Sequence, residues 1–218
     1  LNNWGSFAPP FFISEVDMAS KVEICNSALV SIGASKISSL TENVKAAQEI
    51  NAKFDIVRDH LFRSHPWNCL INRATLSQDS TTPAYGYTYQ YLLPTNPLCL
   101  KVLEFSNGNA TFPYDNLFNR DNLPVFVIEG KKLLTSENIA KIKYIGQITD
   151  TTLYDASLVE TLAAALAAEV CYAITGSNGL SDRAKVDFQE KLKNARFDDA
   201  TEGANQKIEA SDFLEARI

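Results

Sequence analysis

Histidine and the common catalytic motifs are scarce in this sequence. Its 218 residues include two histidines, His60 and His65, and no GxGxxG, GxxxxGK[ST], HExxH or GxSxG motif. The sequence therefore offers few histidines that could serve as zinc ligands or as the base of a Ser-His-Asp relay. Asp198, Asp199 and Glu202 could be considered for acid/base chemistry, but adjacent helical residues point apart, so we predict a solvated face. These absences predict a protein that is not an enzyme and that holds no cofactor and no metal.

A basic excess is also missing. The chain has 20 Lys and Arg against 26 Asp and Glu, a net charge of −6. Proteins that grip nucleic acid through its phosphates usually carry clustered positive charge. Lys131-Lys132 together with Lys141 and Lys143 form one small basic patch. These lysines are either ordinary exposed strand residues or a DNA-facing surface, and an acidic wall past which DNA slides stays compatible with the net charge.

Paired cysteines and long apolar runs are lacking as well. The four cysteines stand far apart without a CxxC motif, so we expect free thiols that pack as small core residues in a reducing cytoplasm. They are Cys25, Cys69, Cys99 and Cys171. The longest apolar run, Leu158 to Ile174, is interrupted by Glu160, Thr161 and Glu169. It falls short of the roughly 18 residues of a membrane span, so we predict no membrane contact.

The first segment, residues 1–17, is unusually apolar for a chain end. Met18 is the single methionine and is followed by Ala19-Ser20 in the manner of a natural start. The segment before it is either native sequence or an addition, and it does not have the pattern of a signal peptide. Its aromatic side chains predict an arm that docks in a groove of this chain or of a neighbouring copy. These residues are Trp4, Phe7, Phe11 and Phe12.

Two helices are expected over residues 18–66. Ser20 is the expected N-cap of the first, which should run to about Ile32, and the second should open at Ser39 or Thr41. Charged residues of the second helix, Arg58 among them, are expected to face solvent.

The second helix must end at the His-Pro-Trp-Asn sequence. Pro66 disfavours helical geometry in His65, the residue before it. We assign His65 a structural role as a donor at the helix end. Trp67 is expected to seat the following segment against the helices.

Short β-like runs fill residues 67–153. Tyr85, Tyr87, Tyr89 and Tyr91 alternate on one face of a predicted strand, and packing is favoured over base stacking for them. Glu129-Gly130-Lys131 predicts a tight hairpin turn. Residues 107–122 read as a loop because they are rich in Asn, Asp, Gly and Pro.

Helical periodicity returns in residues 154–203. An alanine-rich helix is expected from Asp155 to Thr175, contacted on several sides, and a last helix from Ser181 to about Glu202. The polar tail that follows, residues 204–218, has four apolar residues that could anchor it to a partner. They are Ile208, Phe213, Leu214 and Ile218.

Together these patterns predict an α+β fold with one organisation. We expect an antiparallel four-helix bundle, formed by residues 18–66 and 154–203. A small antiparallel β domain, residues 67–153, is inserted between its second and third helices, and an extended C-terminal tail follows.

Three runs of the sequence, in this order, resemble a known family. They are ICNSALVSIGASKISSLTENVKAAQEINAKFDIVRDHLFRSHPWNCLINRATL, YGYTYQYLLPTNPLCLKVLEF and IEGKKLLTSENIAKIKYIGQITDTTLYDASLVETLAAALAAEVCYAITGS. The chain from Met18 to about Gly203 is similar to the head-to-tail adaptors of podovirus-type bacteriophages, the tail tubular protein A family. Residues 1–17 have no counterpart in this resemblance, and the tail varies too much for any residue to be carried over.

The resemblance implies a structural protein of the virion, assembled in the host cytoplasm and located at the phage neck. Such adaptors form a homo-oligomeric ring, typically a dodecamer, between the portal protein and a tail nozzle similar to tail tubular protein B. The ring surrounds the channel for DNA ejection, and the genomic DNA passes through it without sequence-specific binding. On this reading the four apolar tail residues contribute to portal binding.

Two other classes of function remain open from the sequence. A tail-associated cell-wall (peptidoglycan) hydrolase would need two carboxylates within reach of a glycosidic bond, and no such pair stands out. A non-specific DNA-binding module would bind DNA with an affinity that falls steeply with salt.

Overall fold

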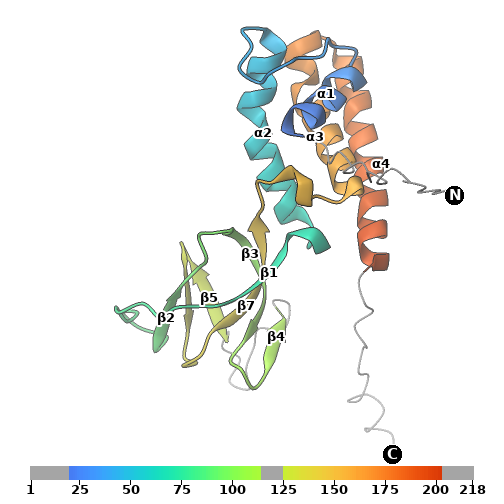
Figure 1. Ribbon diagram of the computed structural model, residues 1–218. Helices are drawn as coiled ribbons and strands as arrows, with labels where there is room; N and C mark the ends of the chain where they lie inside the picture. The colour runs from blue at the N-terminus through green and yellow to red at the C-terminus, as the bar shows by residue number, and fades with distance from the viewer. Residues whose placement is uncertain (1–19, 114–124, 203–218) are drawn as a thin grey trace, which may run out of the picture.

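Four α-helices, two short 3₁₀ helices (Asn68–Leu70 and Thr151–Leu153) and seven strands make up the part of the chain that the computed structural model describes, residues 20–113 and 125–202. The helices are α1 (Lys21–Ser31), α2 (Lys45–Ser64), α3 (Ala156–Thr175) and α4 (Asn178–Glu202). The strands are β1 (Ile71–Thr75), β2 (Tyr89–Leu92), β3 (Leu98–Ser106), β4 (Thr111–Pro113), β5 (Phe126–Glu129), β6 (Lys132–Thr135) and β7 (Lys141–Gln147). The helices gather at one end of the molecule and the strands at the other (Figure 1).

The predicted four-helix bundle with a small β domain is wrong, although the α+β class holds. The strands follow α2 as one block and build two antiparallel sheets instead of one small one. The helices are organised around α3, against which α1, α2 and α4 each pack, and α3 lies between α2 and α4 in Figure 1. Alanine at so many positions of α3 lets three neighbours approach it closely, so one helix becomes the centre of the layer.

Helix ends follow local chemistry in some places and not in others. Ser20 caps α1 as predicted, and it exchanges hydrogen bonds with Glu23 in a capping box. The second helix begins at Lys45, later than predicted, because the Glu42 carboxylate accepts from the backbone of Ser38 and Ser39 and closes a separate turn. The last helix begins at Asn178 and not at Ser181, whose side chain is buried inside its first turns.

The two sheets pack on each other through a shared core. The larger has the order β1-β7-β3-β4 and the smaller the order β2-β6-β5, with β5 and β6 joined at the predicted hairpin. Phe105 of β3 lies 5.2 Å from Phe126 of β5, ring centre to ring centre. Tyr144 of β7 and Leu133 of β6 belong to the same buried cluster. The strand block is therefore a small β sandwich with its own hydrophobic core.

Two predictions within the strand block are corrected. The tyrosines do not form one row, because β2 begins only at Tyr89; Tyr85 is 89% exposed, whereas Tyr91 is buried. The predicted loop at residues 107–122 contains the short edge strand β4, which pairs with the end of β3. A three-residue strand that includes a proline gives almost no periodic signal.

The sandwich and the helices share apolar contacts. Ile145 of β7 and Leu70 are completely buried in the helical core, and Leu100 of β3 packs against it. Next to Ile145, Gly146 allows a close approach: a Cβ there would lie 2.6 Å from Asn72 Nδ2 and 3.0 Å from Pro97 Cγ. This end of β7 is thus fixed between the helical layer and its neighbouring strands.

Candidate functional site

The His-Pro-Trp-Asn sequence forms the junction between the helices and the sandwich. As predicted, α2 ends before Pro66, with Ser64 its last residue. Trp67 is 1% exposed and its indole N–H donates to the carbonyl of Leu61 at 3.2 Å. Its ring lies edge-on to His65, 4.8 Å between centres. Trp67 therefore sits in the helical core at the point where the chain leaves it for the sheet.

Asp199 of α4 connects to the same junction. Its carboxylate lies 2.9 Å from His65 Nε2 and accepts from the Asn68 backbone N–H at 2.8 Å, while its carbonyl accepts from the Asn68 side chain at 2.7 Å. The prediction of a solvated face is wrong for Asp199, whose side chain is only 10% exposed. The His65 ring likewise bonds α4 rather than the end of its own helix. These hydrogen bonds connect α4 to the segment that follows the C-terminus of α2.

Arg58 is the second correction to the predicted surface. Its side chain is 7% exposed and lies 2.8 Å from both Asp55 and Asp59. Gln147 of β7 donates to the other oxygen of Asp59 at 2.6 Å, which ties α2 to the sandwich. A buried guanidinium needs such partners to offset its lost hydration. Arg58 follows Ile50 and Phe54 at intervals of four residues, a spacing that places all three on the buried face of α2. This spacing indicates burial, although the charge of Arg58 favours exposure.

The carboxylates beside Arg58 belong to a larger group of partly buried polar contacts. Asp55 and Asp59 are neighbouring carboxylates of α2, and the guanidinium of Arg58 lies between them and offsets one of their two negative charges. Nearby, burial raises the pKa of Tyr154 to about 12, and its hydroxyl donates to the Ile148 carbonyl at 2.6 Å. Among the described residues no three His, Cys, Asp or Glu side chains gather as a metal site would require. The cluster connects α2 to β7 through Arg58, Asp59 and Gln147, which is a structural role.

A groove of about 620 Å³ opens between α2 and α4. Ala165 and Ala168 of α3 line it between these two helices. Val57 and Phe188 line its walls and are half-buried, while Ile56 on the rim is 68% exposed. The groove therefore combines an apolar interior with direct access from solvent.

The rim of the groove is mainly positive. Lys53 pairs with Glu169 at 2.8 Å, and Lys185 lies on the opposite wall. Arg196 closes one end, where one of its terminal nitrogens donates to the Ser64 carbonyl at 3.3 Å. Its Nε is buried and has no hydrogen-bond partner among the described residues. A buried donor without an acceptor is costly.

α3 is long and apolar enough to cross a membrane, by length and composition alone. Most of it is covered by α1, α2 and α4. This cover accounts for its composition as that of a core helix.

A cationic cavity of about 310 Å³ lies on the outer face of the larger sheet. Arg73 of β1 and Lys143 of β7 are direct cross-strand partners, and Lys141 lines the same cavity. Glu104 pairs with Lys143 at 3.0 Å. Like charges directly opposite each other destabilise a sheet, and the Glu104 carboxylate offsets part of the repulsion between Arg73 and Lys143. Lys132 does not join this patch, because it belongs to the other sheet and pairs with Asp79 at 2.7 Å.

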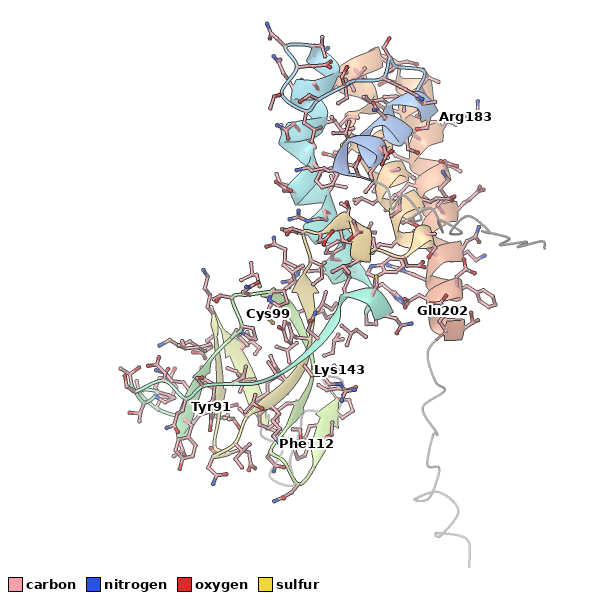
Figure 2. All side chains as sticks on the ribbon, viewed as in Figure 1. Tyr91, Cys99, Phe112, Lys143, Arg183 and Glu202 are labelled. Carbon is pink, nitrogen blue, oxygen red and sulfur yellow. The ribbon has the colours of Figure 1, made fainter. Side chains whose placement is uncertain are left out.

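Figure 2 places the labelled side chains on these parts. Lys143 lies in the β sandwich, whereas Arg183 and Glu202 mark the two ends of α4, Glu202 being nearer the strands. His60 is exposed on α2. The four cysteines are free, as expected.

The two segments predicted to bind partners lie outside the described residues. These are the aromatic arm, with Trp4, Phe7, Phe11 and Phe12, and the tail anchors Ile208, Phe213, Leu214 and Ile218. The groove and the cationic cavity were not predicted as such, because each is assembled from elements distant in the sequence. A scan against models of protein families and a search of curated proteins found no match for this chain.

Proposed function

We propose that this protein is a head-to-tail adaptor of a podovirus-type bacteriophage. It is a structural subunit of a ring, typically a dodecamer, between the portal protein and the tail nozzle. The ring surrounds the channel through which DNA leaves the capsid. The proposal starts from the resemblance of three ordered runs of the sequence, which together cover most of residues 18–203.

The observation that carries the proposal is the end-to-end arrangement of two unlike parts. The helical layer and the β sandwich have separate cores and meet at the braced junction of Trp67, Asp199 and Arg58. A subunit held between two different partners needs two such ends and a rigid connection between them.

Particle images of the purified chain, alone and mixed with candidate portal protein, test the proposal. We expect a monomer or weak association alone and a ring on the portal. Deleting residues 204–218 should leave the fold intact and weaken co-sedimentation with portal. Stable rings without portal, seen by native mass spectrometry, would contradict the assembly order. Failure to bind any portal of a short-tailed phage would contradict the proposal itself.

The cationic cavity favours a second candidate, a non-specific DNA-binding module. Arg73, Lys141 and Lys143 could contact about three phosphates. At a slope of about −0.9 per phosphate, affinity should then fall about 40-fold between 50 and 200 mM salt. Fluorescence anisotropy with duplex DNA measures this, with Arg73→Gln as the variant and Lys36→Gln, on a distant loop, as its control. An adaptor that lets DNA pass instead predicts little affinity at either salt concentration.

A further inference from the structure

The groove between α2 and α4 has a volume of about 620 Å³, twice that of the cationic cavity on the larger sheet. Ala165 and Ala168 in the groove allow a neighbouring backbone to approach closely, and the walls of the groove are apolar. Ile56, 68% exposed at the rim, would lose contact with water if a segment lay across it. A narrow, apolar occupant suits this shape.

We propose that the groove binds the aromatic N-terminal segment of the same chain, with Phe7, Phe11 and Phe12 against its walls. The inference is independent of ring assembly, because it concerns one copy of the chain.

The length of the segment fits the groove. Lys53 to Ser64 of α2 gives the groove a length of about 16 Å at the usual helical rise. Pro9-Pro10 disfavours a helix and favours an extended course. At about 3.1 Å per residue, Phe7 to Phe12 then also spans about 16 Å.

The same copy can supply the segment. Lys21, at the start of α1, lies 3.4 Å from Asp55 and 4.2 Å from the centre of the Phe54 ring, so α1 starts beside α2. To reach the groove the chain must pass over one helix, about 10–12 Å wide. From Phe12 to Ser20 an extended chain covers up to about 27 Å. A tethered segment also has a high effective concentration, which favours it over a segment from another copy.

The polar groups are complementary as well. Residues 1–17 contain Glu15 and Asp17 and no Lys or Arg, whereas the groove carries three cationic side chains against the one carboxylate of Glu169. The cations are Lys53, which pairs with Glu169, Lys185, which pairs with Asp182, and Arg196. A proline-containing segment offers backbone carbonyls and fewer N–H donors. Such a carbonyl is the acceptor that the buried Nε of Arg196 lacks. Shape, reach and hydrogen bonding thus agree on one occupant.

Disulfide trapping in the full chain tests the proposal. The double variant Phe11→Cys with Ile56→Cys places thiols on the segment and on the groove rim. Phe11→Cys with Val186→Cys is the matched control, because Val186 is also exposed on a helix, at 59%, but does not line the groove. Burial raises the pKa of Cys25 to about 12, that of Cys99 to about 11, and that of Cys69 above its usual value, so these three native thiols should compete poorly near pH 8.

We expect an intrachain disulfide in the groove pair, at least tenfold faster than in the control pair, by mass spectrometry of non-reduced peptides. Equal rates in the two pairs would overturn the proposal. Interchain disulfides in the groove pair would show that a second copy provides the segment, and would overturn the choice of the same chain.

Hydrogen exchange gives a second measurement that needs no new thiol. Peptides from residues 1–17 should exchange at least tenfold more slowly in the unaltered chain than in Ile56→Glu, while Val186→Glu leaves them unchanged. Exchange that is equally fast in all three proteins, or slowed equally in all three, contradicts docking in this groove. A portal protein that binds the groove instead would compete with the segment and speed its exchange.

Discussion

Replacing Trp67 with alanine should be among the most destabilising single changes in this protein. The side chain is 1% exposed in the helical core, beside Leu70 at the start of the strand block. Burial of this kind predicts a loss of about 4 kcal/mol on truncation, since Trp→Ala changes typically cost about 3–5 kcal/mol. The lost indole hydrogen bond to Leu61 is part of that figure. With a urea slope of about 2 kcal/mol/M, the unfolding midpoint should fall by about 2 M.

Circular dichroism at 222 nm is the suitable assay, because Trp67 is one of only two tryptophans and its removal would change the fluorescence signal. Trp67→Phe keeps a ring against His65 and loses the N–H donor, so it should cost about 1–2 kcal/mol. Tyr85→Ala, at a side chain that is 89% exposed, is the control and should change the stability by less than about 0.5 kcal/mol. If Trp67→Ala and Tyr85→Ala have the same midpoint, the assignment of Trp67 to the core is refuted.

Three further predictions concern the junction, the close approach in β7 and the acidic side chains. Asp199→Ala removes an acceptor from both His65 and Asn68, and should lower the unfolding free energy by about 2 kcal/mol in the same urea assay; Asp198→Ala, at an exposed neighbour, should not. Gly146→Ala would place a Cβ 2.6 Å from Asn72 Nδ2, so we expect a loss of about 1–3 kcal/mol, and unchanged stability would contradict the observed packing. Hydrogen bonds from Ser157 hold the pKa of Asp155 below its usual 3.8, and the backbone of Ser20 does the same for the pKa of Glu23 below 4.5. Because these pKa values are lower in the folded state, their stabilisation is present above the unfolded-state values and is lost as pH falls below about 4. The unfolding free energy should be level above about pH 5 and decrease in acid, with a shallower decrease in Asp155→Asn, since asparagine can cap a helix without titrating.

Local signals in the sequence predicted local structure well. The capping box of α1, the end of α2 before Pro66 and the hairpin between β5 and β6 depend on residues a few positions apart. The alanine-rich α3 was also expected as a helix contacted on several sides, because composition reports the number of neighbours a helix must accept.

Features that depend on distant residues were not predictable in the same way. The contact between Asn68 and Asp199 joins positions separated by 131 residues, and no local sequence pattern near either residue predicts it. The division of seven strands into two sheets depends on which edges pair, which alternation along one strand does not specify. The charge of Arg58 favours an exposed position, whereas its place on the apolar stripe of α2 favours a buried one, and its ion pairs with acidic neighbours allow the burial.

The junction and the groove are connected through α4. Arg196 closes the groove and donates to Ser64 at the end of α2, and Asp199, on the same face of α4, binds His65 and Asn68. A segment that accepts a hydrogen bond from Nε of Arg196 would therefore also hold this side chain against the end of α2. That position lies beside the hydrogen bonds of Asp199 with His65 and Asn68. The energetic consequence is reciprocal: filling the groove should stabilise the junction, and Asp199→Ala should weaken docking in the groove by the same coupling free energy.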